Sequence, residues 1–271
     1  MPKVLVVAGT ADARQVIEEL LKMNIEVVAT VTTRLGGDLL KPLGNVDVRE
    51  GRITLRWLAG LLSETKPLCL VDASHPFARE ASQNAVDACK RRNVPYIRFE
   101  REETVYTGTD IVKVKDYEQA VQKLCFLEGN ILLTVGSGKM EAFVKIPDYR
   151  NRVYLRVLPE SNVIARCEKL GFNAKNIIAM KGPFTEELNI ALLKYCNASA
   201  MVTKESGNAG GVMEKINAAR KLGIPVIMIE RPEVVHGHKA NAIDAVLEFV
   251  KNCRDARMQE GTAGNMDTTF R

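Results

Sequence analysis

The chain has 271 residues, of which 46% are hydrophobic, 26% charged and 6% aromatic; this globular composition excludes disordered, collagen-like and coiled-coil proteins. The net charge is +5 and no run of Lys and Arg exceeds three residues, so we expect a small acidic ligand rather than a nucleic acid. No apolar run reaches the roughly 18–20 residues that span a bilayer, and no signal peptide is recognisable. We therefore expect a soluble, cytoplasmic protein without membrane contact.

Short apolar runs alternate along the chain with segments of helical periodicity. Seven runs without polar alternation predict buried strands of parallel sheets, at residues 4–8, 27–31, 68–73, 131–135, 177–180, 200–203 and 226–229. Amphipathic stripes predict helices around residues 16–21, 55–62 and 243–250. This alternation of strands and helices predicts the α/β fold class.

Two parts of the chain are similar to each other. Residues 87–101 align without gaps with residues 217–231, and both segments contain Val-Pro or Ile-Pro, a strand and then Glu-Arg. We predict two similar Rossmann-like lobes with mainly parallel sheets, although any two strand–helix units share some of this pattern. The expected divisions are a first lobe (1–102), a second lobe (103–235), a C-terminal helix (236–253) and a flexible tail (254–271).

The loop after the first strand, Gly9-Thr10-Ala11, combines a glycine turn with a helix N-terminus, where phosphate groups bind readily. Because the G-x-G-x-x-G fingerprint is absent, a plain strand-to-helix turn is an equal alternative. After the second strand, Thr32-Thr33-Arg34 stands where an acidic residue usually holds the ribose of NAD. Hydroxyl groups and an arginine suit the 2′-phosphate of NADP better, although Arg34 could simply be solvated.

A third loop, residues 72–78, presents His75 at a strand end, because Pro76 disfavours helix at the residue before it. A site role for this histidine and a structural role are equally expected. The equivalent loop of the second half, residues 203–211, is rich in glycine and carries Lys204, which can contact a carboxylate. Residues 136–139 (Gly-Ser-Gly-Lys) lack the remaining positions of a phosphate-binding P-loop.

Metal ligands and disulfides are not predicted. The six cysteines are dispersed without a Cys-x-x-Cys pair, which favours buried, reduced thiols. His236 and His238 could contact one metal ion, but no third ligand lies near them in the sequence. We therefore expect no bound metal.

Together these loops resemble the precorrin-6A reductases of cobalamin biosynthesis, including the cobalt-precorrin-6A reductases of the anaerobic branch. The resemblance spans residues 3–235 in order. Its most distinctive segments are Asp72-Ala73-Ser74-His75-Pro76-Phe77-Ala78 and Gly182-Pro183-Phe184-Thr185. Family members often have Gly where this chain has Ala8, and Thr where it has Ser74, and neither change removes a chemical group that the site needs. Gly138 is an additional glycine and leaves the placement of Lys139 open.

The resemblance implies reduction of precorrin-6A or cobalt-precorrin-6A to the 6B form by NADPH, with NADH as the alternative. In the first lobe it implies a cofactor site in which Gly9, Thr10 and Ala11 bind the pyrophosphate, Thr32, Thr33 and Arg34 bind the adenosine end, and Ser74, His75 and Pro76 lie beside the nicotinamide. In the second lobe it implies a site for the polycarboxylate tetrapyrrole, with a cleft between the lobes. Its residues would be Ser137, Lys139, Gly182, Lys204 and Ser206, with Arg98, Arg101 and Arg231 as further carboxylate ligands or, equally, salt-bridge partners.

His75 and Lys204 are the candidate proton donors, with water as the alternative. Other enzymes of cobalamin biosynthesis are the expected protein partners. Two other functions stay open: a non-catalytic protein that binds a tetrapyrrole or a nucleotide sugar, and a dehydrogenase of another small acid. The chain has no helical Tyr-x-x-x-Lys pair to support the dehydrogenase.

Overall fold

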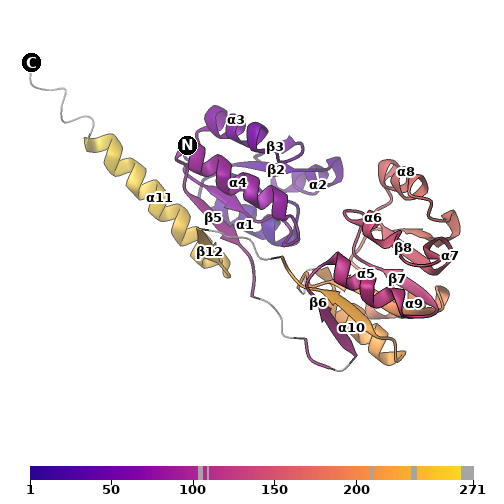
Figure 1. Ribbon diagram of the computed structural model, residues 1–271. Coiled ribbons are helices and arrows are strands. Elements are labelled where there is room, and N and C mark those ends of the chain that lie inside the picture. Colours follow the sequence, from indigo (N-terminus) through magenta and orange to yellow (C-terminus); the bar gives the residue numbers. More distant parts are fainter. Residues whose placement is uncertain (103–105, 109, 208–209, 233–236, 264–271) are drawn as a thin grey trace, which may run out of the picture. The chain divides into compact units, whose positions relative to one another are not determined.

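The computed structural model describes residues 1–102, 106–108, 110–207, 210–232 and 237–263 (Figure 1). The chain divides into two compact units. Unit 1 comprises Met1–Glu102 together with Glu233–Arg271, and unit 2 comprises Glu103–Pro232. Each unit is built around one six-stranded sheet in which every strand pair is parallel. The predicted α/β class with two Rossmann-like sheets is confirmed.

The sheet of unit 1 has the strand order β12-β5-β4-β1-β2-β3. Its strands are β1 (Lys3–Val7), β2 (Glu26–Val31), β3 (Val46–Glu50), β4 (Leu70–Asp72), β5 (Tyr96–Phe99) and β12 (His238–Ala240). Its helices are α1 (Ala11–Lys22), α2 (Arg34–Asp38), α3 (Leu55–Thr65), α4 (Arg79–Arg92) and α11 (Ile243–Ala263), with a 3₁₀ turn at Lys41–Leu43.

Strand β1 shows why these apolar runs form a sheet that is covered on both faces. Val4 and Val6 pack into a core that includes residues of α1 and α11, whereas Leu5 and Val7 pack into a second core with residues of α3 and α4. Successive side chains of a strand point to opposite faces, so a strand buried on both sides must be apolar throughout. The sheet of unit 1 therefore lies between two hydrophobic layers.

The sheet of unit 2 has the strand order β6-β11-β10-β7-β8-β9. Its strands are β6 (Ile111–Val114), β7 (Asn130–Leu133), β8 (Val153–Val157), β9 (Ile177–Ala179), β10 (Ala198–Lys204) and β11 (Val226–Ile229). Its helices are α5 (Tyr117–Cys125), α6 (Met140–Phe143), α7 (Tyr149–Arg152), α8 (Ser161–Lys169), α9 (Glu186–Tyr195) and α10 (Val212–Lys221), with a 3₁₀ turn at Ala174–Asn176.

The two sheets have equivalent strand orders, in which β7, β8, β9, β10 and β11 correspond to β1, β2, β3, β4 and β5. The edge strand beside β5 or β11 comes in each case from the other half of the chain. After β5 the chain leaves unit 1 and forms β6 beside β11, and after β11 it returns and forms β12 beside β5. The two edges match in detail: the Glu100 N–H donates to the Ala240 carbonyl and the Glu230 N–H donates to the Val114 carbonyl, both at 2.9 Å. This equivalence supports the predicted internal repeat.

The C-terminal helix begins and ends later than predicted, because residues 238–240 of the predicted helix (236–253) form strand β12 and α11 begins at Ile243. We expected a flexible tail from residue 254, but α11 continues to Ala263. The segment 254–260 has no apolar period, yet it consists largely of good helix formers, and an apolar period indicates burial rather than helix formation. Residues 233–236, which contain the predicted end of the second lobe and His236, lie outside the described residues, as do residues 264–271 of the predicted tail.

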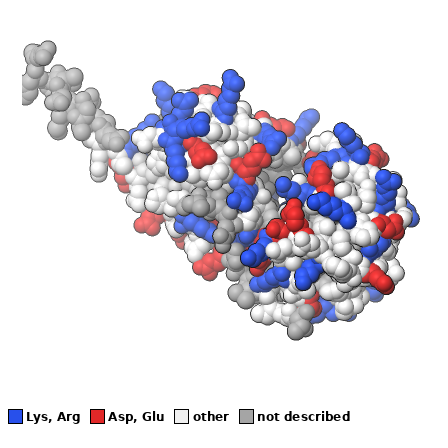
Figure 2. All heavy atoms as spheres, viewed as in Figure 1, with Lys and Arg blue, Asp and Glu red and all other residues white. Residues whose placement is uncertain are grey.

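Charged side chains of both signs are interspersed on the face of the molecule shown in Figure 2, as a mild net charge of +5 leads one to expect. Of the helices in the described part of the chain, none combines the length and the apolar character that a bilayer span requires.

Candidate active site

The predicted cofactor residues lie on three neighbouring strand ends of unit 1. Strands β4, β1 and β2 are adjacent in the sheet, and the loops that follow them carry residues 73–78, 8–10 and 32–33. The strand order reverses between β1 and β4, and in open parallel sheets ligands bind outside the carboxyl ends of the strands at such a reversal. The sheet thus brings together the three loops that the sequence singled out.

The Gly9 loop has a geometry that is suited to binding a phosphate group. Gly9 has a φ of +134°, and a Cβ built on it meets nothing within 4 Å, so the space beside this backbone is open. Thr10 caps α1: its Oγ1 accepts a hydrogen bond from the Ala13 N–H at 2.9 Å and donates one to the Ala73 carbonyl at 2.9 Å. The Thr10 hydroxyl therefore ties two loops together, and the first N–H groups of α1, beginning at Ala11, point out of the helix end.

The loop after β2 places an arginine at the start of a short helix. Thr33 caps α2, and its Oγ1 accepts a hydrogen bond from the Gly36 N–H at 3.1 Å. Thr32 and Arg34 are exposed. The hydroxyl of Thr33 is thus engaged in capping, whereas the Arg34 guanidinium is accessible to a ligand.

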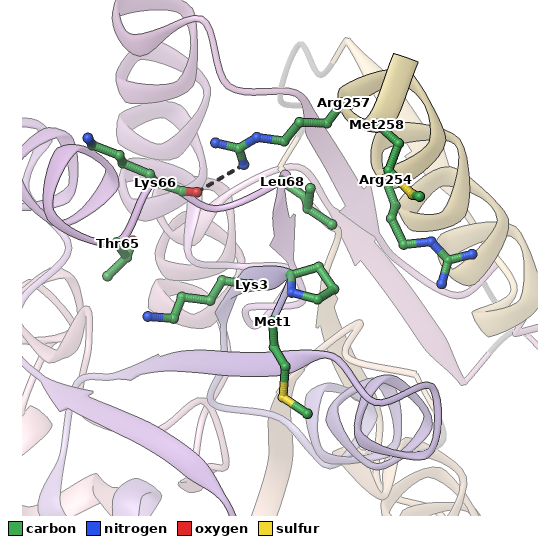
Figure 3. Close-up of a pocket in the computed structure, with 9 residues that line it drawn as sticks. Met1, Lys3, Thr65, Lys66, Leu68, Arg254, Arg257 and Met258 are labelled. Carbon is green, nitrogen blue, oxygen red and sulfur yellow. Dashed lines mark hydrogen bonds between the residues drawn. The ribbon is translucent and has the colours of Figure 1, made fainter. Parts of the chain in front are cut away.

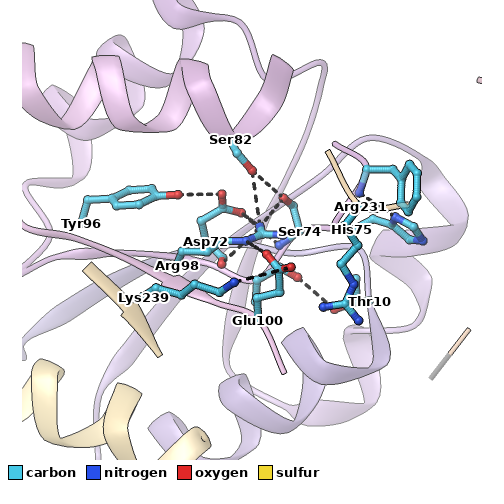
Figure 4. Close-up of polar contacts among 12 residues, drawn as sticks. Thr10, Asp72, Ser74, His75, Ser82, Tyr96, Arg98, Glu100, Arg231 and Lys239 are labelled. Carbon is cyan, nitrogen blue, oxygen red and sulfur yellow. Dashed lines mark hydrogen bonds and ion pairs between the residues drawn. The ribbon is translucent and has the colours of Figure 1, made fainter. Parts of the chain in front are cut away.

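A buried ionic network fixes the loop that follows β4 (Figure 4). Asp72 and Arg98 are directly opposite each other on β4 and β5, and Arg98 Nη1 lies 2.8 Å from Asp72 Oδ1. Their side chains are 0% and 1% exposed. Asp72 also accepts hydrogen bonds from the Tyr96 hydroxyl at 2.9 Å and from the Ser74 N–H at 3.0 Å. Burial raises the pKa of Asp72, but the charge of Arg98 and hydrogen bonds from Ser82 and Ser74 outweigh it and hold this pKa below its usual value.

This network changes the roles of two predicted residues. Arg98, a predicted ligand of a substrate carboxylate, instead lies in the interior and pairs with Asp72, because the parallel register places the two residues opposite each other. Ser74 is 7% exposed and its Oγ accepts a hydrogen bond from Arg98 Nη1 at 2.9 Å. Its side chain therefore supports the loop from within. Arg101 is half-exposed and lies 3.0 Å from Asp12, the salt-bridge alternative that the sequence left open.

The loop places His75 next to this network (Figure 4). His75 Nδ1 accepts a hydrogen bond from the Phe77 N–H at 3.2 Å. A ring nitrogen that accepts cannot carry a proton, so the neutral imidazole is the Nε2–H tautomer. In this state the N–H of His75 is at Nε2; His75 would supply a proton from the imidazolium form, in which Nδ1 is protonated and no longer accepts.

The predicted substrate residues of unit 2 lie along the carboxyl edge of its sheet. Ser137 and Lys139 follow β7, Lys204 ends β10 and Ser206 follows it. Gly182 follows β9, an edge strand that is separated from β10 by β7 and β8. Arg231 follows β11 and pairs with Glu205, again the salt-bridge alternative. Burial lowers the pKa of Lys204 to about 8.

Comparison with known proteins identifies the family. The family model described as precorrin-6x reductase CbiJ/CobK matches residues 3–251. The chain belongs to the precorrin-6x reductase family.

Several curated members of the precorrin-6x reductase family are similar over most of their length. A cobalt-precorrin-6A reductase of Priestia megaterium is 38% identical over 92% of this chain and 98% of its own. A cobalt-precorrin-6A reductase of Methanothermobacter thermautotrophicus is 38% identical over 92% and 85%, and a precorrin-6A reductase of Rhodobacter capsulatus is 32% identical over 92% and 94%. A solved structure of CobK precorrin-6A reductase superimposes with a TM-score of 0.76 and 27% identity, covering 93% of this chain and 97% of that one.

Two buried cations of the chain were not identified as site residues from the sequence. Arg156 lies on β8 in an otherwise apolar run, and Lys215 lies on α10 within the buried stripe formed with Val212, Ile216 and Ala219. Both are only 6% exposed. In both cases a charged residue interrupts an apolar pattern in the sequence, and this interruption could have marked the residue as a candidate.

Cavities of unit 1 also lie away from the strand-end loops. One of about 490 Å³ lies at the amino end of β1 and is lined by residues such as Pro2, Lys3 and Leu68 (Figure 3). Arg257 of α11 donates a hydrogen bond to the Lys66 carbonyl beside it, at 3.1 Å. Within the described residues, no group of three or more His, Cys, Asp or Glu side chains is arranged to hold a metal ion.

Proposed function

We propose that this protein reduces precorrin-6A, or its cobalt form, to the 6B form with NADPH as the cofactor, and that the strand-end loops of unit 1 bind that cofactor. The main support for the proposal is the open turn at Gly9, which precedes α1. The hydroxyl of Thr10 connects this turn to the loop of His75 by a hydrogen bond to the Ala73 carbonyl. A phosphate can lie over such a turn and accept hydrogen bonds from the helix N-terminus. The family match over residues 3–251 supplies the reaction.

NADPH supplies a hydride, and the protein's contribution is to bind and orient the reactants. Gly9, Thr10 and Ala11 would hold the pyrophosphate by their backbone, and Pro76 and His75 would lie beside the nicotinamide. Ser74 contributes indirectly, because its hydroxyl accepts from Arg98 and keeps the loop in place. The polycarboxylate tetrapyrrole is assigned to unit 2, where Ser137, Lys139, Gly182, Lys204 and Ser206 are its predicted contacts. All six cysteines are free thiols, as is usual in the cytosol, where we place the protein.

His75 provides the direct test of this proposal. The wild-type chain should transfer hydride from NADPH to precorrin-6A in a single turnover, measured as loss of NADPH fluorescence. Replacing His75 with Ala should slow that step about 10²-fold, the lower end of the effect of a proton donor, with little change in the Kd of NADPH. The matched control is His238→Ala, because His238 is exposed on β12 of the same unit. Unchanged transfer in His75→Ala would remove the donor role, and a wild-type chain that binds NADPH without transfer would indicate a binding protein instead.

Arg34 tests the choice between NADPH and NADH. Its exposed guanidinium should bind the 2′-phosphate that only NADPH carries, through charge-assisted hydrogen bonds worth about 1.5–3 kcal/mol. Arg34→Ala should therefore weaken NADPH binding about 10- to 100-fold and leave NADH binding nearly unchanged. Titration of each nucleotide by fluorescence measures both constants. Equal losses for the two cofactors would contradict the 2′-phosphate assignment.

A further inference from the structure

A groove runs along the amino edge of the sheet in unit 1. It consists of two cavities, of about 1040 Å³ and about 490 Å³, whose linings share Lys66, Leu68 and Arg257. Strands β1, β4 and β5 begin at this edge, whereas the loops proposed to bind the cofactor follow the carboxyl ends of the strands. A ligand in the groove would therefore leave the cofactor loops accessible.

Helix α11 forms one wall of the groove, and the C-terminal ends of α3 and α4 form the other. Five residues of α11 line the larger cavity: Phe249, Asn252, Cys253, Ala256 and Arg257. Their spacing of three and four residues places them on one side of the helix. At a rise of 1.5 Å per residue, the lining residues of α11 from Phe249 to Met258 extend over about 14 Å. The groove is thus as long as two to three helical turns.

The floor of the groove is apolar. Leu62, Val86 and Tyr96 are buried at its base, and Val94 and Phe249 are half-buried, so part of their surface faces the larger cavity. Removal of such a surface from water favours binding of an apolar ligand face.

Cationic side chains surround this floor. Six of them line the two cavities, and no Asp or Glu is among the described lining residues; the six are Lys3, Lys66, Lys90, Arg92, Arg254 and Arg257 (Figure 3). Lys3 lies 3.5 Å from Glu26 and Arg254 lies 3.4 Å from Asp255, so these two have counter-ions outside the lining. In the described part of the chain, no carboxylate oxygen lies within 4.0 Å of the charged nitrogens of the other four.

The helix ends account for only part of this charge. Lys66 is the C-cap of α3, Lys90 and Arg92 lie in the last turn of α4, and Arg257 donates a hydrogen bond to the Lys66 carbonyl at 3.1 Å. The C-terminus of a helix carries about half a negative charge, so the two helix ends together offset about one of the four cations. The remaining positive charge repels itself and attracts an anionic ligand.

We propose that this groove binds an acidic amphipathic helix of a partner protein. The apolar face of such a helix would cover the floor, and its carboxylates would pair with the cations on the walls. The groove extends along α11 beyond the larger cavity, which alone reaches the upper limit of roughly 300–1,000 Å³ for small-molecule sites. The chain itself has a net charge of +5, so a different, acidic protein is more complementary to the groove than a second copy.

Cys253 reports occupancy of the groove directly. Its thiol is half-buried and lines the larger cavity, whereas Cys125, also half-buried, lies on α5 of unit 2 and is the internal reference. The probe is a synthetic helical peptide with Leu on one face and Glu elsewhere, and the control peptide has Lys in place of each Glu. At about ten times its Kd, the acidic peptide should slow alkylation of Cys253 by N-ethylmaleimide in the full chain about 10-fold, measured by mass spectrometry. The rate at Cys125 should not change, and the Lys peptide should protect neither thiol.

Removal of charge tests the walls of the groove. The double variant Lys66→Gln/Lys90→Gln should weaken binding of the acidic peptide about 2- to 30-fold, the effect of two partly exposed ion pairs. The control, Lys251→Gln, removes an exposed lysine of α11 that is not among the lining residues and should bind the peptide as the wild type does. Both variants should retain hydride transfer, so the groove and the proposed function can fail independently.

Four results would overturn the proposal. An unprotected Cys253 in the presence of the acidic peptide would exclude the helix, and equal protection by the Lys peptide, or unchanged binding by the double variant, would exclude the role of charge. Protection by uroporphyrin, a compact polycarboxylate, without protection by the acidic peptide would assign the groove to a small molecule. Protection that increases with the concentration of the chain alone would assign it to a second copy.

Discussion

Replacing Asp72 with Asn should destabilise unit 1 by about 3–5 kcal/mol, the usual cost of removing one partner from a buried ion pair. The variant leaves the Arg98 guanidinium, 1% exposed, without the carboxylate that lies 2.8 Å away. The hydrogen bonds from Tyr96 and from the Ser74 N–H to this carboxylate are weakened as well. Trp57, the single tryptophan of the chain, lies on α3 of unit 1, so denaturant unfolding followed by its fluorescence reports this unit alone.

The matched control is Asp47→Asn. Asp47 also pairs with an arginine, Arg49, at 2.9 Å, but this pair is on the surface of unit 1 and its loss should cost only about 0–1 kcal/mol. The pH dependence gives a second check. Because folding lowers the pKa of Asp72, its contribution is complete above the unfolded pKa near 3.8 and declines as the pH falls below that value. The difference between wild type and Asp72→Asn should therefore shrink in acid, and a difference that is constant with pH would contradict the ionic role.

A chain that ends at Pro232 should fail to fold unit 1. This truncation removes the edge strand β12 and helix α11, which packs against α1. Val246 and Val250 of α11 are fully buried in the core of unit 1, and burying two such side chains contributes about 3–6 kcal/mol. Together with the lost strand pairing, this approaches the whole stability of a typical domain, about 5–15 kcal/mol.

Trp57 fluorescence of the truncated chain should match that of the unfolded state, while circular dichroism retains the signal of unit 2. The control is a chain that ends at Ala263 and keeps all of α11. Native Trp57 fluorescence in the chain that ends at Pro232 would show that unit 1 does not depend on its C-terminal segment.

Most of the fold could be predicted from the sequence, because strands that are buried on both faces are continuous apolar runs. The predicted runs at residues 4–8, 27–31 and 226–229 coincide with β1, β2 and β11 to within a residue at either end. Strand β12 could not be predicted, because His238-Lys239-Ala240 is short and mostly polar. Its place at an edge requires no apolar run, and its partner β5 lies far away in the sequence.

The position of a site residue could be predicted where the neighbouring sequence determines it, but not where the register between strands determines it. Pro76 indicated the strand-end position of His75, which follows β4 in the structure. The role of Arg98 could not be derived, since its pairing with Asp72 follows from the register between β4 and β5. Whether the loop residues bind the cofactor and the substrate stays a prediction.

The exchanged edge strands also determine the order in which the protein is completed during translation. Domains generally fold as units while the ribosome synthesises the chain, the N-terminal one first. Here unit 2 is continuous in sequence and is complete once Pro232 has left the ribosome, whereas unit 1 waits for β12 and α11. Unit 1, which is begun first, is therefore completed last. The edge of β5 lacks its partner strand β12 while more than a hundred further residues are synthesised.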